Sequence, residues 1–376
     1  MNERLLIPDP EKLSRYGWDA TWNEKWALST AMEENEAGLE PARVLSENRG
    51  HWTVGTAGGA RRAELTGKLR FAAVSALDRP AVGDWVRLRP GGPDDPALIE
   101  GVLERRSLLT RKAPGETSRE QILAANVDYA FVVSSMNADL NPRRIERYLA
   151  VVWNGGAEPV VVLTKADLRS EKERAEDHER LAEIALGARV IEASGFTGHG
   201  VDGIRELLAP GRTGVLIGSS GVGKSTLTNA LLNASVQTVR DIREDDAKGR
   251  HTTTGRELFE LPGGGCLIDT PGMRELGVMA DGDDGIAHGF PEIEALLGRC
   301  RFTDCAHETE PGCVIRAALE TGEVSAERLA SYRKLEREAA FQARKGDKAA
   351  ESRERKQWKR ITVQARSQMK RKRGEG

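Results

Sequence analysis

The chain has 376 residues, of which 39% are hydrophobic and 30% charged, so it is long enough for two or three domains with apolar cores. This composition excludes a wholly disordered protein. The net charge is −2, but residues 344–376 hold 13 Lys and Arg against 4 Asp and Glu, a net +9, which leaves −11 for the rest. A basic tail on an acidic body is typical of a segment that contacts nucleic acid, although a solvated helix has the same composition.

The first residues, MNERLLIPDPEKL, contain neither a long apolar core nor the small-residue cleavage site of a secretory signal. No apolar stretch approaches the roughly 18 residues that a membrane span needs. We therefore expect a cytoplasmic protein without membrane contacts. We also expect it to be a monomer. In that compartment its four cysteines are not expected to form disulfides.

Residues 1–39 form an N-terminal extension rich in tryptophan. Trp18, Trp22 and Trp26 are spaced i, i+4 and i+8, which places them on one face of a helix. We predict that this face docks on the body of the protein. The alternative is that the rings stack on RNA bases.

Residues 40–112 contain short β-like runs separated by turns rich in Gly and Pro. The strands are expected at residues 42–45, 51–54, 65–70, 84–88 and 97–103. Five short strands in this length favour a small barrel, with the OB-fold as the leading candidate. RNA binding would suit the basic residues of this region, which are Arg43, Arg49, Arg61, Arg62, Lys68, Arg70, Arg87 and Arg89.

Residues 113–290 alternate between strand-like and helix-like patterns. Strands are expected at residues 127–134, 159–163, 189–193 and 214–217, and helices at 142–152, 171–186, 201–208 and 226–232. A polar segment at 237–256 precedes two strands, 257–261 and 265–268, that should pair around Gly263 and Gly264. The alternation predicts a doubly wound, mostly parallel α/β sheet, with ligands at the carboxyl ends of its strands.

A phosphate-binding loop, G-x-x-x-x-G-K-S, follows the strand at 214–217 and opens the next helix. Its backbone N–H groups and those of the helix start would cradle a phosphate. Lys224 would reach the β- and γ-phosphates, and the Ser225 hydroxyl would ligate Mg²⁺. The alternative is a chance Gly-rich turn. The residues expected to bind nucleotide here are Gly218, Ser219, Ser220, Gly221, Val222, Gly223, Lys224, Ser225 and Thr226.

A T-K-x-D motif, Thr164-Lys165-Ala166-Asp167, ends the buried strand at 159–163. A carboxylate there can accept hydrogen bonds from N1–H and the 2-amino group of guanine, which adenine does not offer. GTPases usually have Asn at the first position, and Thr164 can make fewer hydrogen bonds. Ser194, at the end of another strand, is expected to close over the guanine carbonyl.

Asp269-Thr270-Pro271-Gly272 ends the strand at 265–268. Asp269 would hold Mg²⁺ through water, and the Gly272 N–H would contact the γ-phosphate. For the threonine that binds Mg²⁺ and the γ-phosphate we favour Thr253, with Thr252 as the alternative. The guanine motif precedes the phosphate loop, so the motifs have the order of a circularly permuted GTPase.

Met273 follows the D-T-P-G motif, where many GTPases have a glutamine that orients the attacking water. A thioether cannot do this, so intrinsic hydrolysis should be slow. His251 is a candidate to complete the catalytic site, and the alternative is that it only supports its loop.

Cys300, Cys305, His307 and Cys313 form C-x₄-C-x-H-x₅-C. Three thiolates and one imidazole suit a tetrahedral structural Zn²⁺. The alternative is a set of unrelated residues. RNA contacts are expected from the flanking arginines, which are Arg299, Arg301 and Arg316. Cys266 lies in a strand and is interpreted as a small buried hydrophobic residue.

Residues 40–340 resemble the ribosome small-subunit-dependent GTPase A family of bacterial assembly factors. The resemblance rests on the nucleotide motifs, the Cys/His spacing, GRHTTT, and the segments 82–86 and 125–128. It implies an OB-fold at 40–112, a permuted GTPase domain at 113–290 and a mainly helical zinc domain at 291–343. The N-terminal extension and the basic tail at 344–376 lie outside the resemblance. The resemblance also implies GTP hydrolysis stimulated by the small ribosomal subunit, 16S rRNA binding and a role in late subunit maturation. The alternative is a non-ribosomal switch or small-molecule kinase with a structural zinc site.

Overall fold

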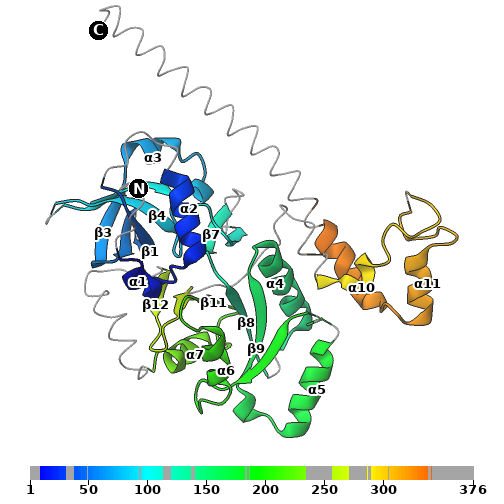
Figure 1. Cartoon of the computed structure of the whole chain (residues 1–376). Helices are drawn as coiled ribbons and strands as arrows, with labels where there is room; N and C mark the ends of the chain where they lie inside the picture. The colour runs from blue at the N-terminus through cyan, green and yellow to red at the C-terminus, as the bar shows by residue number, and fades with distance from the viewer. Residues whose placement is uncertain are drawn as a thin grey trace, which may run out of the picture.

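Figure 1 shows the computed structural model of the chain. It describes residues 9–30, 38–48, 50–92, 95–112, 120–136, 140–182, 184–185, 187–233, 256–270, 286, 289–303, 305–337 and 340. Several residues singled out from the sequence lie outside these ranges, as does the basic tail; among them are Arg49, His251, Thr252, Thr253, Pro271, Gly272 and Met273. Within the described residues, none of the helices combines the length and the apolar character that crossing a membrane requires.

The N-terminal extension folds as α1 (Pro10–Leu13), η2 (Ser14–Tyr16) and α2 (Ala20–Thr30), and α2 lies against the barrel (Figure 1). Trp18, Trp22 and Trp26 are at most 4% exposed. The Trp18 ring meets Trp85 of the barrel edge-on, with centroids 4.6 Å apart. The predicted docking is confirmed, and the base-stacking alternative is wrong because the rings are inaccessible.

Five strands, β1 (Glu40–Asn48), β2 (His51–Thr56), β3 (Gly59–Leu65), β4 (Trp85–Arg89) and β5 (Ala97–Val102), form the barrel. Their order is β1-β2-β3-β5-β4, and an additional β1–β4 pairing closes it. Between β3 and β4 lie α3 (Gly67–Ala72) and η3 (Ala76–Asp78). The closed five-stranded barrel confirms the predicted OB-like fold.

The strand predicted at residues 65–70 is wrong. Strand β3 starts earlier, at Gly59, and ends at Leu65, and a helical turn follows. The Thr66 hydroxyl accepts a hydrogen bond from the Leu69 N–H at 3.3 Å and so caps α3. This local cap favours a helix where apolar alternation suggested a strand.

Arg43 is buried, so the prediction that it belongs to an RNA-binding surface is wrong. It is 1% exposed and donates to the carbonyl oxygens of Tyr16 (3.0 Å) and Asn126 (3.1 Å). Its guanidinium carbon lies 5.2 Å from the Trp85 ring centroid. Burial lowers the pKa of Arg43 to about 10, so it stays charged at neutral pH. Arg43 therefore ties the extension, the barrel and the junction at Asn126 together.

The second sheet has the strand order β10-β9-β8-β11-β13-β12. The strands are β8 (Tyr129–Ser135), β9 (Glu158–Thr164), β10 (Arg189–Ala193), β11 (Thr213–Ile217), β12 (Glu257–Glu260) and β13 (Cys266–Asp269). The pairings from β10 to β13 are parallel, and β12 is antiparallel to β13, as predicted. A pairing of Ser46 with Glu257 makes this sheet continuous with the barrel.

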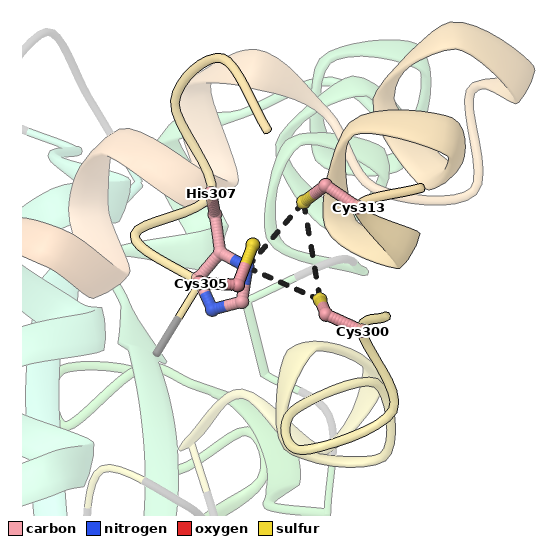
Figure 2. Close-up of side chains that lie close together, drawn as sticks. All are labelled: Cys300, Cys305, His307 and Cys313. Atoms are coloured by element: carbon pink, nitrogen blue, oxygen red, sulfur yellow. Dashed lines mark hydrogen bonds between the residues drawn. The ribbon is translucent and has the colours of Figure 1, made fainter. Parts of the chain in front are cut away.

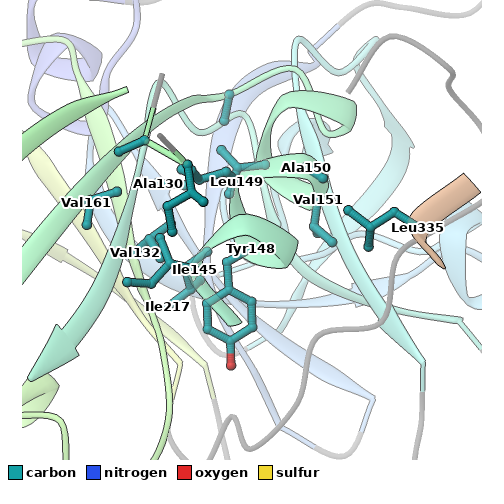
Figure 3. Packing of buried hydrophobic residues seen from close by; sticks show 14 of the residues in the cluster. Ala130, Val132, Ile145, Tyr148, Leu149, Ala150, Val151, Val161, Ile217 and Leu335 are labelled. Carbon is teal, nitrogen blue, oxygen red and sulfur yellow. The ribbon is translucent and has the colours of Figure 1, made fainter. Parts of the chain in front are cut away.

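Helices cover both faces of the sheet, which confirms the doubly wound α/β fold. One core holds side chains of α4 (Pro142–Asn154), several of which are labelled in Figure 3, and of α5 (Glu171–Ala182). The other holds those of α6 (Val201–Leu207) and α7 (Lys224–Leu231). Helix α5 ends at Ala182, short of the predicted residue 186.

A two-stranded sheet, which the sequence did not predict, links the barrel to the α/β sheet. It consists of β6 (Leu108–Lys112) and β7 (Glu120–Ala125). Ser107, just before β6, exchanges hydrogen bonds with Val127 through its hydroxyl, each 2.7 Å long. This pairing fixes where β8 begins.

The C-terminal module, residues 289–303 and 305–337, is helical and lies beside α4 (Figure 1). It contains α10 (Pro291–Glu294), α11 (Val314–Thr321) and a helix at residues 326–337. Ile315 and Leu335 share a buried core with Val151 of α4, and Figure 3 shows Leu335 beside Val151. The module is therefore packed on α4 by an apolar contact.

Candidate functional site

The phosphate loop connects β11 to α7 at the carboxyl edge of the parallel strands. Gly218 has φ 149°, and a Cβ there would lie 2.3 Å from the Val133 carbonyl oxygen. Gly223, directly before α7, has φ 100°. Any side chain at Gly218 would push the loop off β8, so glycine is required for this path.

Lys224 curls back over the loop. Its Nζ donates to the carbonyl oxygens of Gly218 at 2.7 Å and Ser219 at 2.6 Å. Burial lowers the pKa of Lys224, while the charge of Asp269 acts in the opposite direction. Ser225 and Thr226, in the first turn of α7, are exposed at the same edge. The arrangement presents an ammonium group, a hydroxyl and a helix N-terminus together, which suits a polyphosphate.

Thr164, at the end of β9, contacts the phosphate loop. Its hydroxyl forms a short hydrogen bond to the Val222 carbonyl oxygen and lies 3.3 Å from the Ser134 carbonyl oxygen. The sequence analysis placed Thr164 in the guanine motif. The structure shows that its side chain braces the loop between β8, β9 and α7.

The other residues of the guanine motif directly follow Thr164 at the end of β9. Lys165 has a left-handed backbone with φ 61°, and Ala166 starts the short helix η4 (Ala166–Leu168). Asp167 is exposed at this edge. Because β9 and β10 are parallel neighbours, Ser194, which follows β10, lies at the same sheet edge as Asp167, which follows β9. The two segments therefore border one side of the phosphate loop.

The Ser194 loop packs on the first turn of α7. Ser194 is 1% exposed, and its hydroxyl accepts from the Thr197 N–H at 3.1 Å. A Cβ on Gly195 would lie 2.9 Å from the Leu227 N, so only glycine allows this approach. The buried Ser194 hydroxyl therefore stabilises the turn formed by residues 194–197.

Asp269 ends β13, the strand next to β11, and is 7% exposed. The neighbouring Thr270 hydroxyl donates to the Leu216 carbonyl oxygen at 3.1 Å. These contacts fix the end of β13 beside the phosphate loop. The structure thus brings Asp269, Lys224 and the loop to one edge.

Arg144 is a site residue that the sequence analysis missed. It lies in the first turn of α4, and its Nη1 donates to the Ser219 Oγ at 2.8 Å. The Asn141 side chain caps this helix by accepting from the Arg144 N–H at 3.1 Å. The sequence could have predicted this contact. Asn141 and Pro142 are typical of a helix start, and this helix follows β8, so its first residues are expected at the same sheet edge as the phosphate loop.

Cys300, Cys305, His307 and Cys313 converge, with ligand atoms all within 4.8 Å of one another (Figure 2). The His307 Nδ1 lies 3.4 Å from the sulfurs of both Cys300 and Cys313, which are 4.0 Å apart. A tetrahedral Zn²⁺ requires about 3.5 Å between nitrogen and sulfur and about 3.8 Å between sulfurs. The backbone N–H of Val314, at the start of α11, lowers the pKa of the Cys300 thiol. The four residues therefore fit a zinc ion.

Cys266 is separate from this cluster. It is fully buried in β13, and burial raises its thiol pKa to about 11. The thiol donates to the Arg15 carbonyl oxygen at 3.3 Å. As predicted, it packs as a small apolar residue.

The OB-like barrel, the nucleotide motifs in rotated order on a doubly wound sheet, and the Cys₃His cluster define a circularly permuted P-loop GTPase. The family model described as "RsgA GTPase" matches residues 102–279. The "Small ribosomal subunit biogenesis GTPase RsgA 2" of Lactiplantibacillus plantarum is 46% identical over 323 residues, 85% of this chain and 89% of that protein. The RsgA protein of Streptomyces avermitilis is 45% identical over 364 residues, 96% of this chain and 94% of its own length. The chain belongs to the RsgA GTPase family.

Solved structures agree with this fold. YjeQ from Thermotoga maritima is 29% identical with a TM-score of 0.60, over 80% of this chain and 98% of that one. YloQ, described as a circularly permuted GTPase, has a TM-score of 0.57 at 21% identity, over 82% of this chain and 98% of its own. Both likenesses support the permuted topology.

Proposed function

We propose that this protein hydrolyses GTP to GDP and phosphate during late maturation of the small ribosomal subunit. It acts in the cytoplasm, as a monomer that binds 16S rRNA and leaves after hydrolysis. The observation that carries this proposal is the phosphate loop between β11 and α7, bordered by the Asp167 segment, in a chain of the RsgA GTPase family. The names of the curated relatives supply the ribosomal context.

For guanine binding, the exposed Asp167 carboxylate accepts from N1–H and the 2-amino group of the base. Thr164 contributes indirectly by positioning the phosphate loop, because its hydroxyl donates a hydrogen bond to the Val222 carbonyl oxygen. Ser194 supports the turn that closes over the base. The remaining contacts to phosphate come from the loop residues 218–226.

Magnesium would be held by the Ser225 and Thr253 hydroxyls and, through water, by Asp269. When bound, it neutralises charge that develops on the phosphates. The Gly272 N–H would contact the γ-phosphate, and His251 would orient the attacking water, which Met273 cannot do. Since the Met273 thioether offers no such help, fast turnover requires the bound subunit.

The Cys₃His cluster holds a structural zinc, since four protein ligands leave no open position for water. Arg299 and Arg301 beside it are exposed, and Arg316 is half-buried. They supply phosphate contacts to rRNA. Loss of the γ-phosphate relaxes Thr253 and Gly272 and changes the geometry between this module and the barrel.

The test is GTP turnover with and without purified 30S subunits, over a range of salt concentrations. We expect strong stimulation that weakens with salt, because phosphate contacts release counterions. Lys224→Ala should abolish turnover under both conditions. Turnover that ignores the subunit, or phosphate transfer to a small molecule instead of water, would favour the alternative switch or kinase.

A further inference from the structure

Ser219 of the phosphate loop is contacted from two sides. The Lys224 Nζ donates to its carbonyl oxygen at 2.6 Å, and the Arg144 Nη1 donates to its hydroxyl at 2.8 Å. Two cationic groups from different helices therefore meet at one loop residue. The second of them belongs to neither the phosphate loop nor α7.

Two residues further along α4, Glu146 is bound to the C-terminal module. The Arg328 Nη1 donates to the Glu146 Oε1 at 2.6 Å, and both side chains are 4% exposed. Arg328 also donates to the Glu292 Oε1 at 2.6 Å and to the Gly289 carbonyl oxygen. Its guanidinium carbon lies 4.2 Å from the Phe290 ring centroid. Arg328 is thus clamped by three groups of its own module and by Glu146.

Helix α4 connects these two contacts rigidly. Arg144 and Glu146 are about 3 Å apart along the helix axis, so a shift of the helix moves both. A buried ion pair tolerates little displacement, since each charge loses its compensation when the pair opens. The position of Arg144 relative to Ser219 therefore depends on how the C-terminal module sits on α4.

We propose that Arg144 is a positioning residue of the phosphate loop, and that the buried Glu146–Arg328 ion pair makes its position depend on docking of the C-terminal module. The proposal rests on the proposed nucleotide-binding function. An RNA that binds the C-terminal module could then change nucleotide binding through the Arg328–Glu146 and Arg144–Ser219 contacts. Displacing the module moves Arg144 and weakens its hold on Ser219.

The first test measures binding of mant-GDP and of a non-hydrolysable mant-GTP analogue, with Mg²⁺, to the full chain. Arg144→Gln and Ser219→Ala should each weaken binding about 10-fold, the lower end of the contribution of a hydrogen bond to a charged group. The double variant should bind no more weakly than the weaker single variant, because both remove the same contact. Arg144→Lys should recover part of the loss, and KM for GTP should rise more than kcat falls. Arg180→Gln, a surface change on α5, is the control.

The second test compares Arg328→Met, which leaves Glu146 buried without its main partner and so loosens the module, with Glu146→Met combined with Arg328→Met, which replaces the pair with apolar side chains. Binding of the same two probes should weaken in Arg328→Met by about the factor seen for Arg144→Gln, and it should recover in the double Met variant, where the module docks again. Adding Arg144→Gln to Arg328→Met should then cost less than it costs in the parent chain.

Three results would overturn the proposal. They are unchanged binding in Arg144→Gln, effects of Arg144→Gln and Ser219→Ala that multiply, and a folded Arg328→Met variant that binds like the parent. Failure of the proposed function gives a different result, since the parent chain would then bind neither probe.

Discussion

Replacing Arg328 with Met should undock the C-terminal module from α4. The substitution keeps much of the side-chain volume but leaves Glu146, which is 3% exposed, without its main partner. Removing one member of a buried ion pair costs about 3–5 kcal/mol. Arg143 still lies 3.3 Å from the Glu146 carboxylate, so we take the lower value, about 3 kcal/mol.

Hydrogen–deuterium exchange of peptides from residues 289–337 measures this directly. A loss of about 3 kcal/mol should speed exchange through local opening by about 100-fold in this module, while the barrel is unaffected. Arg337→Met, an exposed position on the same helix, serves as the control. Equal protection in the Arg328→Met variant and the parent chain would refute the reasoning that this ion pair holds the module.

Three further substitutions test other contacts. Cys313→Ser should reduce zinc from about one ion per chain toward none in metal analysis, whereas Cys266→Ser should retain it; equal zinc in both would exclude the assigned cluster. Asp167→Asn should weaken GTP binding by at least about 100-fold and favour xanthosine triphosphate in a competition assay, because the new amide donates where the carboxylate accepted; an unchanged preference contradicts the guanine assignment. Trp22→Ala should lower the free energy of unfolding in urea by about 3–5 kcal/mol, and a loss under 1 kcal/mol would contradict its role in docking the extension.

Local motifs predicted most of the nucleotide edge. Each loop follows a buried strand, and parallel strands bring their carboxyl ends together, so Asp167, Lys224 and Asp269 could be assigned to one edge from the chain alone. The Cys/His spacing worked in the same way, because its four ligands lie within 14 consecutive residues. The strand at 65–70 failed because the Thr66 cap outweighed apolar alternation.

Side-chain contacts between residues far apart in the chain could not be predicted from local sequence patterns. The basic composition of the barrel made Arg43 look like a surface residue, yet it is buried between the extension and the junction. Thr164 was placed in the guanine motif, but the motif gave no sign that its hydroxyl braces the loop through Val222. Arg43 reaches Asn126, 83 residues away along the chain, and Thr164 reaches Val222, 58 residues away, and periodicity carries no information over such separations.

By itself, the amino-acid sequence determined the fold class, the rotated motif order and the ligand set of the zinc cluster. These follow from local patterns, since strand ends, glycine turns and metal-ligand spacing depend on neighbouring residues. Only the tertiary structure decided which helix contacts the loop and which module contacts that helix. The contacts of Arg144 with Ser219 and of Arg328 with Glu146 span 75 and 182 residues. They form only because α4 packs on the sheet beside the phosphate loop and shares a core with the C-terminal module.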